Sequence, residues 1–173
     1  MGAGTRASLA IVAVLFSATG DVDADSGGDV VEPTEVRAAR PISLFAGLSM
    51  YYGFIPIPSL RATLNVTPRL AFQVQAESAV VLSQAEIGAI WYFGRGSASG
   101  FAVARAGYQH YEPLGDGVPE SPATATAGAG IESVRESGWG MFVEATASVV
   151  AAGPDNQLPG WLARLAFGIG RRF

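Results

Sequence analysis

The sequence predicts an all-β protein, an eight-stranded antiparallel up-and-down barrel whose strands cross a membrane. Three observations support this prediction. From Ile42 to Phe173, apolar side chains alternate with small or polar ones in eight segments of roughly ten residues. Charged residues within these segments keep almost entirely to the polar parity, and all ten prolines are expected outside the strands. An even number of such segments is what a transmembrane barrel needs to close.

The chain begins with the features of a secretory signal peptide. Arg6 supplies a positive charge, the apolar run Leu9–Phe16 follows it, and small residues come next. This run is shorter than the ~20 residues with which a helix crosses a bilayer. We therefore expect a signal peptide over residues 1–20, with residue 24 as an alternative cleavage point.

Residues 21–41 are predicted to form a flexible acidic leader, because six acids against two arginines leave little apolar surface to bury. The acids Asp21, Asp23, Asp25, Asp29 and Glu32 match the spacing of a calcium loop. Ser26 stands where that loop needs Gly, and no amphipathic helix flanks it, which favours a solvated tail. We expect no metal ion and no cofactor.

The barrel is predicted over residues 42–173, and seven of its segments have clear faces. They are expected at about residues 42–54, 59–67, 69–80, 86–94, 124–132, 139–149 and 161–173. The fifth segment, residues 100–111, is ambiguous. If Arg105 points inward, Phe101 and Val103 do too, and small alanines with Tyr108 face outward. A bulge near Gly107 would give a more apolar exterior.

Charge placement predicts which face is the interior. Ten charged residues fall in the segments, and nine share the polar parity: Arg61, Arg69, Glu77, Glu86, Arg105, Glu132, Glu144, Arg164 and Arg172. The exception, Arg171, lies near the chain end, at the expected level of the lipid headgroups. An Arg on the lipid face at the bilayer centre costs ~2–4 kcal/mol, so the pattern favours an apolar exterior and an ionic interior.

An eight-stranded barrel is only wide enough for side chains to fill it. Buried ions need partners, and Arg–carboxylate pairs supply them. We therefore expect a plugged interior with a network of ion pairs among Arg61, Glu77, Glu86, Arg105, Glu132, Glu144 and Arg164.

Aromatic residues are expected at two rims, as at the two membrane interfaces. One rim would hold Tyr52, Phe54, Tyr111 and Trp161, and the other Trp91, Phe93, Trp139 and Phe173. A soluble secreted barrel with its apolar face inward is the alternative, but it leaves both rims unexplained.

The chain resembles the small eight-stranded outer-membrane barrels, of the kind shown by outer-membrane proteins A and X. The resemblance covers about residues 41–173, and the terminal segment 166–173 looks like the family's assembly signal. Gly168 and Phe173 match that signal, whereas Arg171 stands where an apolar residue is usual. The resemblance implies an outer-membrane location with both termini in the periplasm, and recognition of Phe173 by the barrel-assembly machinery.

With this topology, inner turns are expected near 67–69, 95–99 and 134–137. Outer loops are expected near 55–58, 83–84, 112–122 and 151–159. The loop over residues 112–122 is the most plausible contact surface, although an ordinary solvated loop is the simpler interpretation.

The predicted role is structural or a surface interaction, in contact with outer-membrane lipid and lipopolysaccharide, and the protein is expected to be a monomer. A narrow pore for small solutes is one alternative. A lipid A or phospholipid-modifying enzyme is another, but the single histidine, His110, has no neighbouring Ser in the sequence. No catalytic residue is assigned, and no basic run suggests nucleic acid.

Overall fold

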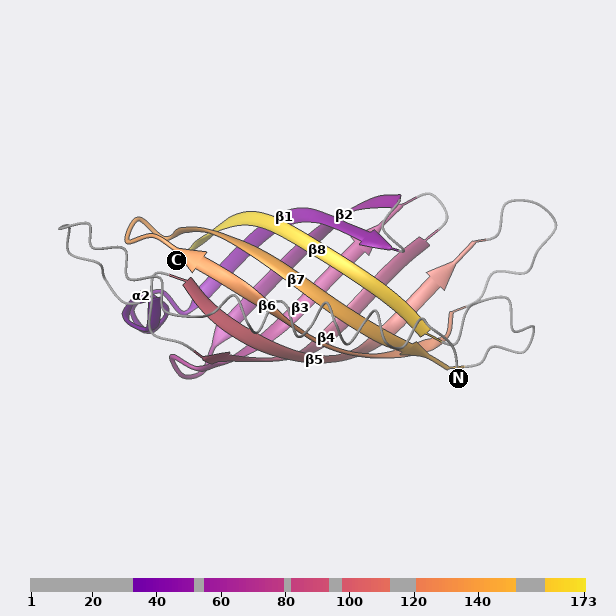
Figure 1. Ribbon diagram of the computed structural model, residues 1–173, viewed down its shortest axis with the longest axis horizontal. Helices are drawn as coiled ribbons and strands as arrows, with labels where there is room; N and C mark the ends of the chain where they lie inside the picture. Colours follow the sequence, from indigo (N-terminus) through magenta and orange to yellow (C-terminus); the bar gives the residue numbers. More distant parts are fainter. Residues whose placement is uncertain (1–32, 52–54, 80–81, 94–97, 113–120, 152–160) are drawn as a thin grey trace.

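The chain folds into a closed barrel of eight antiparallel strands, in which sequential strands are neighbours and the last pairs with the first. The structure, a computed structural model, describes residues 33–51, 55–79, 82–93, 98–112, 121–151 and 161–173. The strands are β1 (Ile42–Tyr51), β2 (Ile55–Asn65), β3 (Leu70–Ser78), β4 (Leu82–Phe93), β5 (Ala98–Tyr111), β6 (Ala123–Val134), β7 (Trp139–Val150) and β8 (Trp161–Arg172). Among the residues described before β1, the helix α2 (Pro33–Ala39) lies at one mouth of the barrel, near the C-terminus (Figure 1).

Each strand alternates between a buried and an exposed face, which confirms the predicted eight-stranded fold. The exposed face is apolar: Phe72, Ile87 and Val143 are 58%, 63% and 44% exposed. The buried face points into the lumen and carries the polar and charged residues. This is the reverse of a soluble barrel, because here the hydrocarbon-like surface faces outward.

The fifth strand adopts the regular arrangement. Phe101, Val103 and Arg105 are buried, and Tyr108 is 67% exposed. Pairing of β5 continues through Gly107 on both sides without an extra residue, so the alternative with a bulge there is wrong.

Two of the connections that the sequence predicts as outer loops differ from the prediction. Pro56 and Pro58 lie within β2, paired with Met50 and Leu48 of β1. Pairing of β2 with β3 begins only at Ser59, so these prolines lie where the ladder with β3 needs no amide hydrogen. The expected loop at residues 83–84 is also wrong, because Ser83 and Gln84 pair with the end of β3.

The leader is not flexible throughout. Residues 33–39 form α2, and its Val36 and Arg37 are 5% and 1% exposed, because they pack against the mouth of the barrel. The predicted signal peptide, the calcium-like pattern and the remaining leader up to residue 32 lie outside the described residues. Among those described, no helix combines the length and apolarity needed to cross a membrane.

Two turns at the α2 end are well defined. Gly138, with a positive φ of 85°, closes the β6–β7 turn, and its amide donates to the Arg135 carbonyl at 2.8 Å. Arg69 belongs to the β2–β3 turn and is exposed, so the expectation that it faces the lumen is wrong. Arg69 precedes Leu70, the first residue of β3, so the alternation of inward and outward side chains along β3 does not extend to it.

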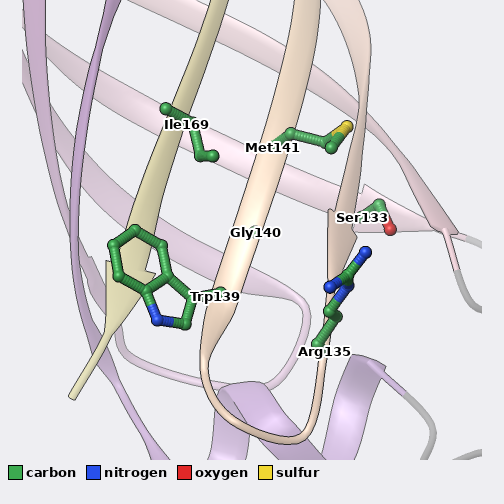
Figure 2. Close-up of a pocket in the computed structure, with 6 residues that line it drawn as sticks. All are labelled: Ser133, Arg135, Trp139, Gly140, Met141 and Ile169. Carbon is green, nitrogen blue, oxygen red and sulfur yellow. The ribbon is translucent and has the colours of Figure 1, made fainter.

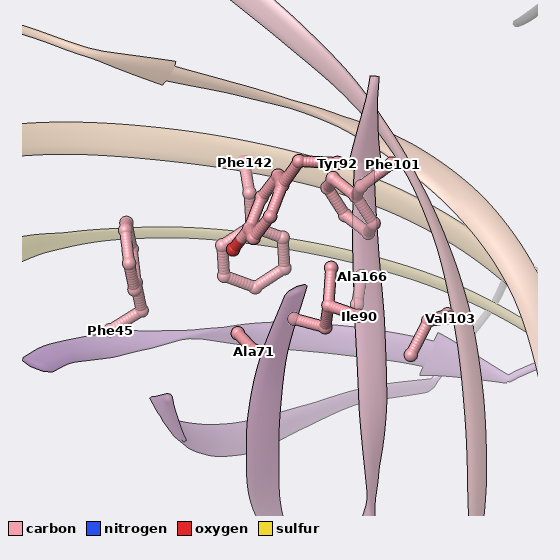
Figure 3. Packing of buried hydrophobic residues seen from close by; sticks show 8 residues of the cluster. All are labelled: Phe45, Ala71, Ile90, Tyr92, Phe101, Val103, Phe142 and Ala166. Atoms are coloured by element: carbon pink, nitrogen blue, oxygen red, sulfur yellow. The ribbon is translucent and has the colours of Figure 1, made fainter. Parts of the chain in front are cut away.

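Aromatic rings fill the lumen toward the α2 end (Figure 3). Phe45 and Phe142 meet edge to face with ring centroids 5.5 Å apart, and Tyr92 and Phe101 lie 5.9 Å apart. A side chain at Gly168 would collide with the Phe142 ring. The absence of a Cβ at this position therefore makes room for the ring.

Candidate functional site in the barrel lumen

In the described strands, four arginines and four glutamates face the lumen and are almost completely buried. They are Arg61 of β2, Glu77 of β3, Glu86 of β4, Arg105 of β5, Glu132 of β6, Glu144 of β7, and Arg164 and Arg172 of β8. The period of two explains their placement, because each shares the parity that faces inward on its strand. The formal charges of these eight side chains cancel.

The first half of the network begins away from α2. Arg164 lies 2.9 Å from the Glu77 carboxylate and 3.0 Å from Glu86. Glu86 lies 3.3 Å from Arg105, which also pairs with Glu144. Arg105 therefore bridges two carboxylates, and Arg164 bridges three, because it also lies 3.8 Å from Glu144.

The second half continues toward α2. Arg61 is 3.4 Å from Glu144 and 3.6 Å from Glu132, and Glu132 pairs with Arg172. Arg61 also lies over the Phe142 ring, 4.4 Å from its centroid. The eight residues thus form one continuous chain of alternating charge, which is the arrangement that offsets the cost of burying ions.

Neutral side chains complete the network, and the sequence analysis did not single them out. Tyr51 contacts Glu77, and Gln75 donates to the same carboxylate at 2.6 Å. Near α2, the Tyr92 hydroxyl donates to Glu132 at 3.1 Å and accepts from Arg172 at 3.1 Å. The signal that could have found them is parity, because all share the inward face with the charged residues.

Arg37 of α2 closes the lumen at its end. Its Nε donates to the Pro68 carbonyl and its Nη2 to Ser99 Oγ, both at 3.0 Å. The guanidinium carbon lies 4.3 Å from the centroid of the Tyr92 ring. Burial lowers the pKa of Arg37, and the Glu132 carboxylate opposes that shift. Through Arg37 and Tyr92, α2 is therefore connected to Glu132, at the end of the ion-pair network that lies nearest this helix.

The predicted interfacial aromatics divide into two groups. Trp91, Trp139 and Trp161 are on the exterior and about half exposed, whereas Phe93 is only partly exposed. Tyr52 and Phe54 lie outside the described residues. Exposed Tyr108, near the end of the barrel opposite α2, joins this outer surface and was not predicted as an interfacial residue.

The two residues of the predicted assembly signal occupy different environments. Gly168 faces the lumen beneath Phe142, whereas Phe173 is 60% exposed. The backbone amide of Phe173 donates to the Ile42 carbonyl at 2.8 Å, which fastens the chain end to β1. Their role in assembly stays a prediction.

His110 has a partner that the sequence analysis missed. Its Nδ1 lies 2.9 Å from Ser121 Oγ, and both residues are exposed. The contact arises because β5 and β6 are antiparallel neighbours, and sequence adjacency does not reveal it. Within the described part of the chain, no group of three or more His, Cys, Asp or Glu side chains is arranged to hold a metal ion.

No protein-family model matches the chain. No curated protein matches it either. Solved structures do match. The N-terminal β-barrel domain of OprF from Pseudomonas aeruginosa is 17% identical, covers 75% of this chain and 96% of that domain, and has a TM-score of 0.55. Neisserial surface protein A is 12% identical over 76% of this chain and 94% of that one, with a TM-score of 0.54.

A structure from the de novo design of transmembrane β-barrels is also similar. It is 15% identical over 76% of this chain and 94% of the designed one, with a TM-score of 0.50. The fold of this chain is therefore that of the small eight-stranded outer-membrane β-barrels.

Proposed function

We propose that this chain is an integral outer-membrane protein with a closed lumen, and that its role is structural or a surface interaction. The observation that carries the proposal is the chain of eight buried charges inside an exterior of exposed apolar side chains. The similarity of fold to OprF and Neisserial surface protein A supports the membrane location.

The lumen chemistry argues against an open passage for solutes. Successive ion pairs connect Glu77 to Arg172, and aromatic rings occupy the space toward α2. A solute would have to separate buried pairs, and leaving one such charge without its partner costs roughly 3–5 kcal/mol. The narrow-pore alternative therefore requires a rearranged interior.

Planar-bilayer recordings test the closed lumen. The purified protein should show no steady conductance, whereas a variant with Arg105→Ser and Glu144→Ser should conduct, because it removes a central ion pair. Large, steady conductance from the unaltered protein would refute the closed lumen and favour the pore.

The location has a separate test. Membrane fractionation should recover the protein with the outer membrane, and its gel mobility should change on boiling. We further propose periplasmic termini, contact with lipopolysaccharide on the opposite side, insertion by the barrel-assembly machinery and a monomeric state. Protease added outside intact cells should spare a tag before α2, and cleavage of that tag would overturn the proposed orientation.

One contact favours a second candidate function, the hydrolysis of lipid esters. His110 and Ser121 are within hydrogen-bonding distance on the exterior, the arrangement of a base beside a hydroxyl nucleophile. Acyl release from phospholipid or lipid A by the unaltered protein, lost in both His110→Ala and Ser121→Ala, would support it. Absence of turnover in the unaltered protein would eliminate it.

A further inference from the structure

A row of three exposed side chains runs from the β6–β7 turn across β7 to β8 on the exterior at the α2 end. The amide of Arg135 donates to the Trp139 carbonyl at 2.8 Å, and Trp139 pairs across the sheet with Arg171. Trp139 is 50% exposed, and both arginines are exposed. An indole thus stands between two cationic side chains on the apolar surface of the barrel.

A groove lies beside this row, toward the middle of the barrel (Figure 2). Its volume is about 250 Å³, and its lining residues are Ser133, Arg135, Trp139, Gly140, Met141 and Ile169. It is hollow because Ser133, opposite Met141, is small, and so is its other neighbour, Ala98. Figure 2 shows Arg135 reaching toward Ser133, while Trp139 lies on the side of Ile169.

We propose that this groove binds one anionic phospholipid of the phosphatidylglycerol class, from the membrane leaflet at the α2 end. Arg135, which lines the groove, holds the phosphate, and Arg171 adds positive charge on the other side of Trp139, with its guanidinium carbon 5.8 Å from the centroid of the Phe173 ring. An acyl chain lies along Met141 and Ile169, which are 56% and 59% exposed. Trp139 lies at the level of the glycerol esters, where indoles are favoured. The proposal rests on the proposed membrane location and adds a specific lipid to it.

Charge complementarity selects the headgroup. Among the described residues, the outward side chains of β6, β7 and β8 at this end include Arg171 and no carboxylate, and Glu136 in the β6–β7 turn is an exposed acid nearby. The ammonium group of a zwitterionic headgroup would meet two like charges. An uncharged glycerol headgroup leaves only the attractive phosphate contacts.

Trp91 provides a matched comparison within the same molecule. It lies on the exterior at the same end of the barrel and is 54% exposed. Its cross-strand neighbours are Leu70 and Ala102, both uncharged, but exposed Arg69 precedes Leu70, and the Arg69 carbonyl accepts from the Tyr92 amide at 2.7 Å. With Arg69 replaced by Gln, a lipid that recognises arginines should gather at Trp139 and not at Trp91.

The experiment uses two full-length variants, each with one remaining tryptophan. Trp91→Phe with Trp161→Phe leaves Trp139. Trp139→Phe with Trp161→Phe leaves Trp91, and Arg69→Gln in this second protein removes the exposed arginine beside that indole. Each protein is placed in phosphatidylcholine bilayers that contain a minor fraction of brominated lipid, either phosphatidylglycerol or phosphatidylcholine. Quenching of the fluorescence then reports which lipid contacts the indole.

We expect brominated phosphatidylglycerol to quench Trp139 more strongly than brominated phosphatidylcholine, and the two lipids to quench Trp91 equally. One interfacial arginine contributes a factor of about five to anionic lipid binding. Arg135→Gln in the protein that retains Trp139 should therefore lower the enrichment about fivefold. Arg69→Gln, which changes an exposed arginine in a different turn at the same end, should leave it unchanged.

Equal quenching of Trp139 by both lipids would overturn the groove as a site while leaving the membrane location intact. An equal loss of enrichment in Arg69→Gln would also overturn it, because general surface charge would then explain the effect. If neither tryptophan is quenched by either lipid, the proposed membrane location fails, and the site fails with it.

Discussion

Replacing Glu144 by Gln should be among the most damaging single changes to the lumen. Glu144 is fully buried and pairs with Arg105, with Arg61 at 3.4 Å and with Arg164 at 3.8 Å. The substitution keeps the shape of the side chain but leaves three guanidiniums sharing the remaining carboxylates. Removing one partner from a buried ion pair costs roughly 3–5 kcal/mol, because the uncompensated charge stays buried.

Two contributions explain this magnitude. The arginines lose their electrostatic attraction to Glu144, and they do not regain the hydration that they lost on burial. At 4 Å, one ion pair gains about 4 kcal/mol at the effective dielectric constant of protein sites, and burial costs several kcal/mol per ion. When the carboxylate is removed, the attraction disappears, but the arginines remain out of water. The free energy of unfolding should therefore fall by about 3–5 kcal/mol.

Urea unfolding of protein folded into phospholipid vesicles, followed by tryptophan fluorescence, measures this change. Glu136→Gln is the matched control: Glu136 is exposed in a turn, so its substitution should change stability by no more than about 0.5 kcal/mol. Adding Arg105→Gln to Glu144→Gln restores neutrality. The double variant should thus be more stable than the sum of the single effects predicts, by about 0.5–3 kcal/mol. A loss below about 1 kcal/mol in Glu144→Gln would refute the argument that the lumen depends on paired ions.

Three further predictions use the same unfolding assay. Arg37→Ala should lower the free energy of unfolding by about 2 kcal/mol, because it removes a buried cation–π contact and two hydrogen bonds at the mouth of the lumen. An unchanged midpoint of urea unfolding would mean that α2 does not stabilise the barrel. Ile87→Arg should lower the free energy of unfolding by ~2–4 kcal/mol, because Ile87 lies mid-strand on the apolar exterior. Ile87→Leu is the near-neutral control, and equal stability of the two variants would contradict a lipid-facing surface. Gly168→Val should lower stability by about 1–3 kcal/mol, because the new side chain would collide with the Phe142 ring and the Ala46 carbonyl. When Phe142→Ala serves as the background, the same substitution should cost less, because the collision with the ring is gone. A Gly168→Val protein that inserts poorly but is fully stable once folded would instead assign Gly168 to assembly alone.

Much of the fold could be predicted from the alternation of residues. The period of two located all eight strands, and the rule that charges avoid lipid identified the inner face, even for the ambiguous strand around Arg105. The prolines misled the prediction at β2. A proline interrupts a strand where a neighbouring strand needs its amide hydrogen. Pro56 and Pro58 are tolerated because β3 does not pair with this stretch of β2.

The helix at the end of the leader, α2, could not be predicted for a different reason. An acidic segment without a hydrophobic face has no local cause to fold, and residues 33–39 become ordered because the barrel offers them partners. Arg37 finds the Tyr92 ring and the Pro68 carbonyl, which come from strands and turns far along the chain. The partner of His110 was hidden in the same way, because Ser121 approaches it across a strand pair.

The sequence by itself determined which side chains face inward and which face outward, because the pleat of a strand makes orientation a property of parity. Only the closed barrel decided which guanidinium meets which carboxylate. That choice depends on the register of every strand pair and on the position at which β8 returns to β1. Arg172 and Glu132 are forty residues apart in the chain and become partners only when the sheet closes. The alternation along each strand therefore sets the inward and outward faces of the sheet. The network of ion pairs in the lumen forms only when the barrel closes.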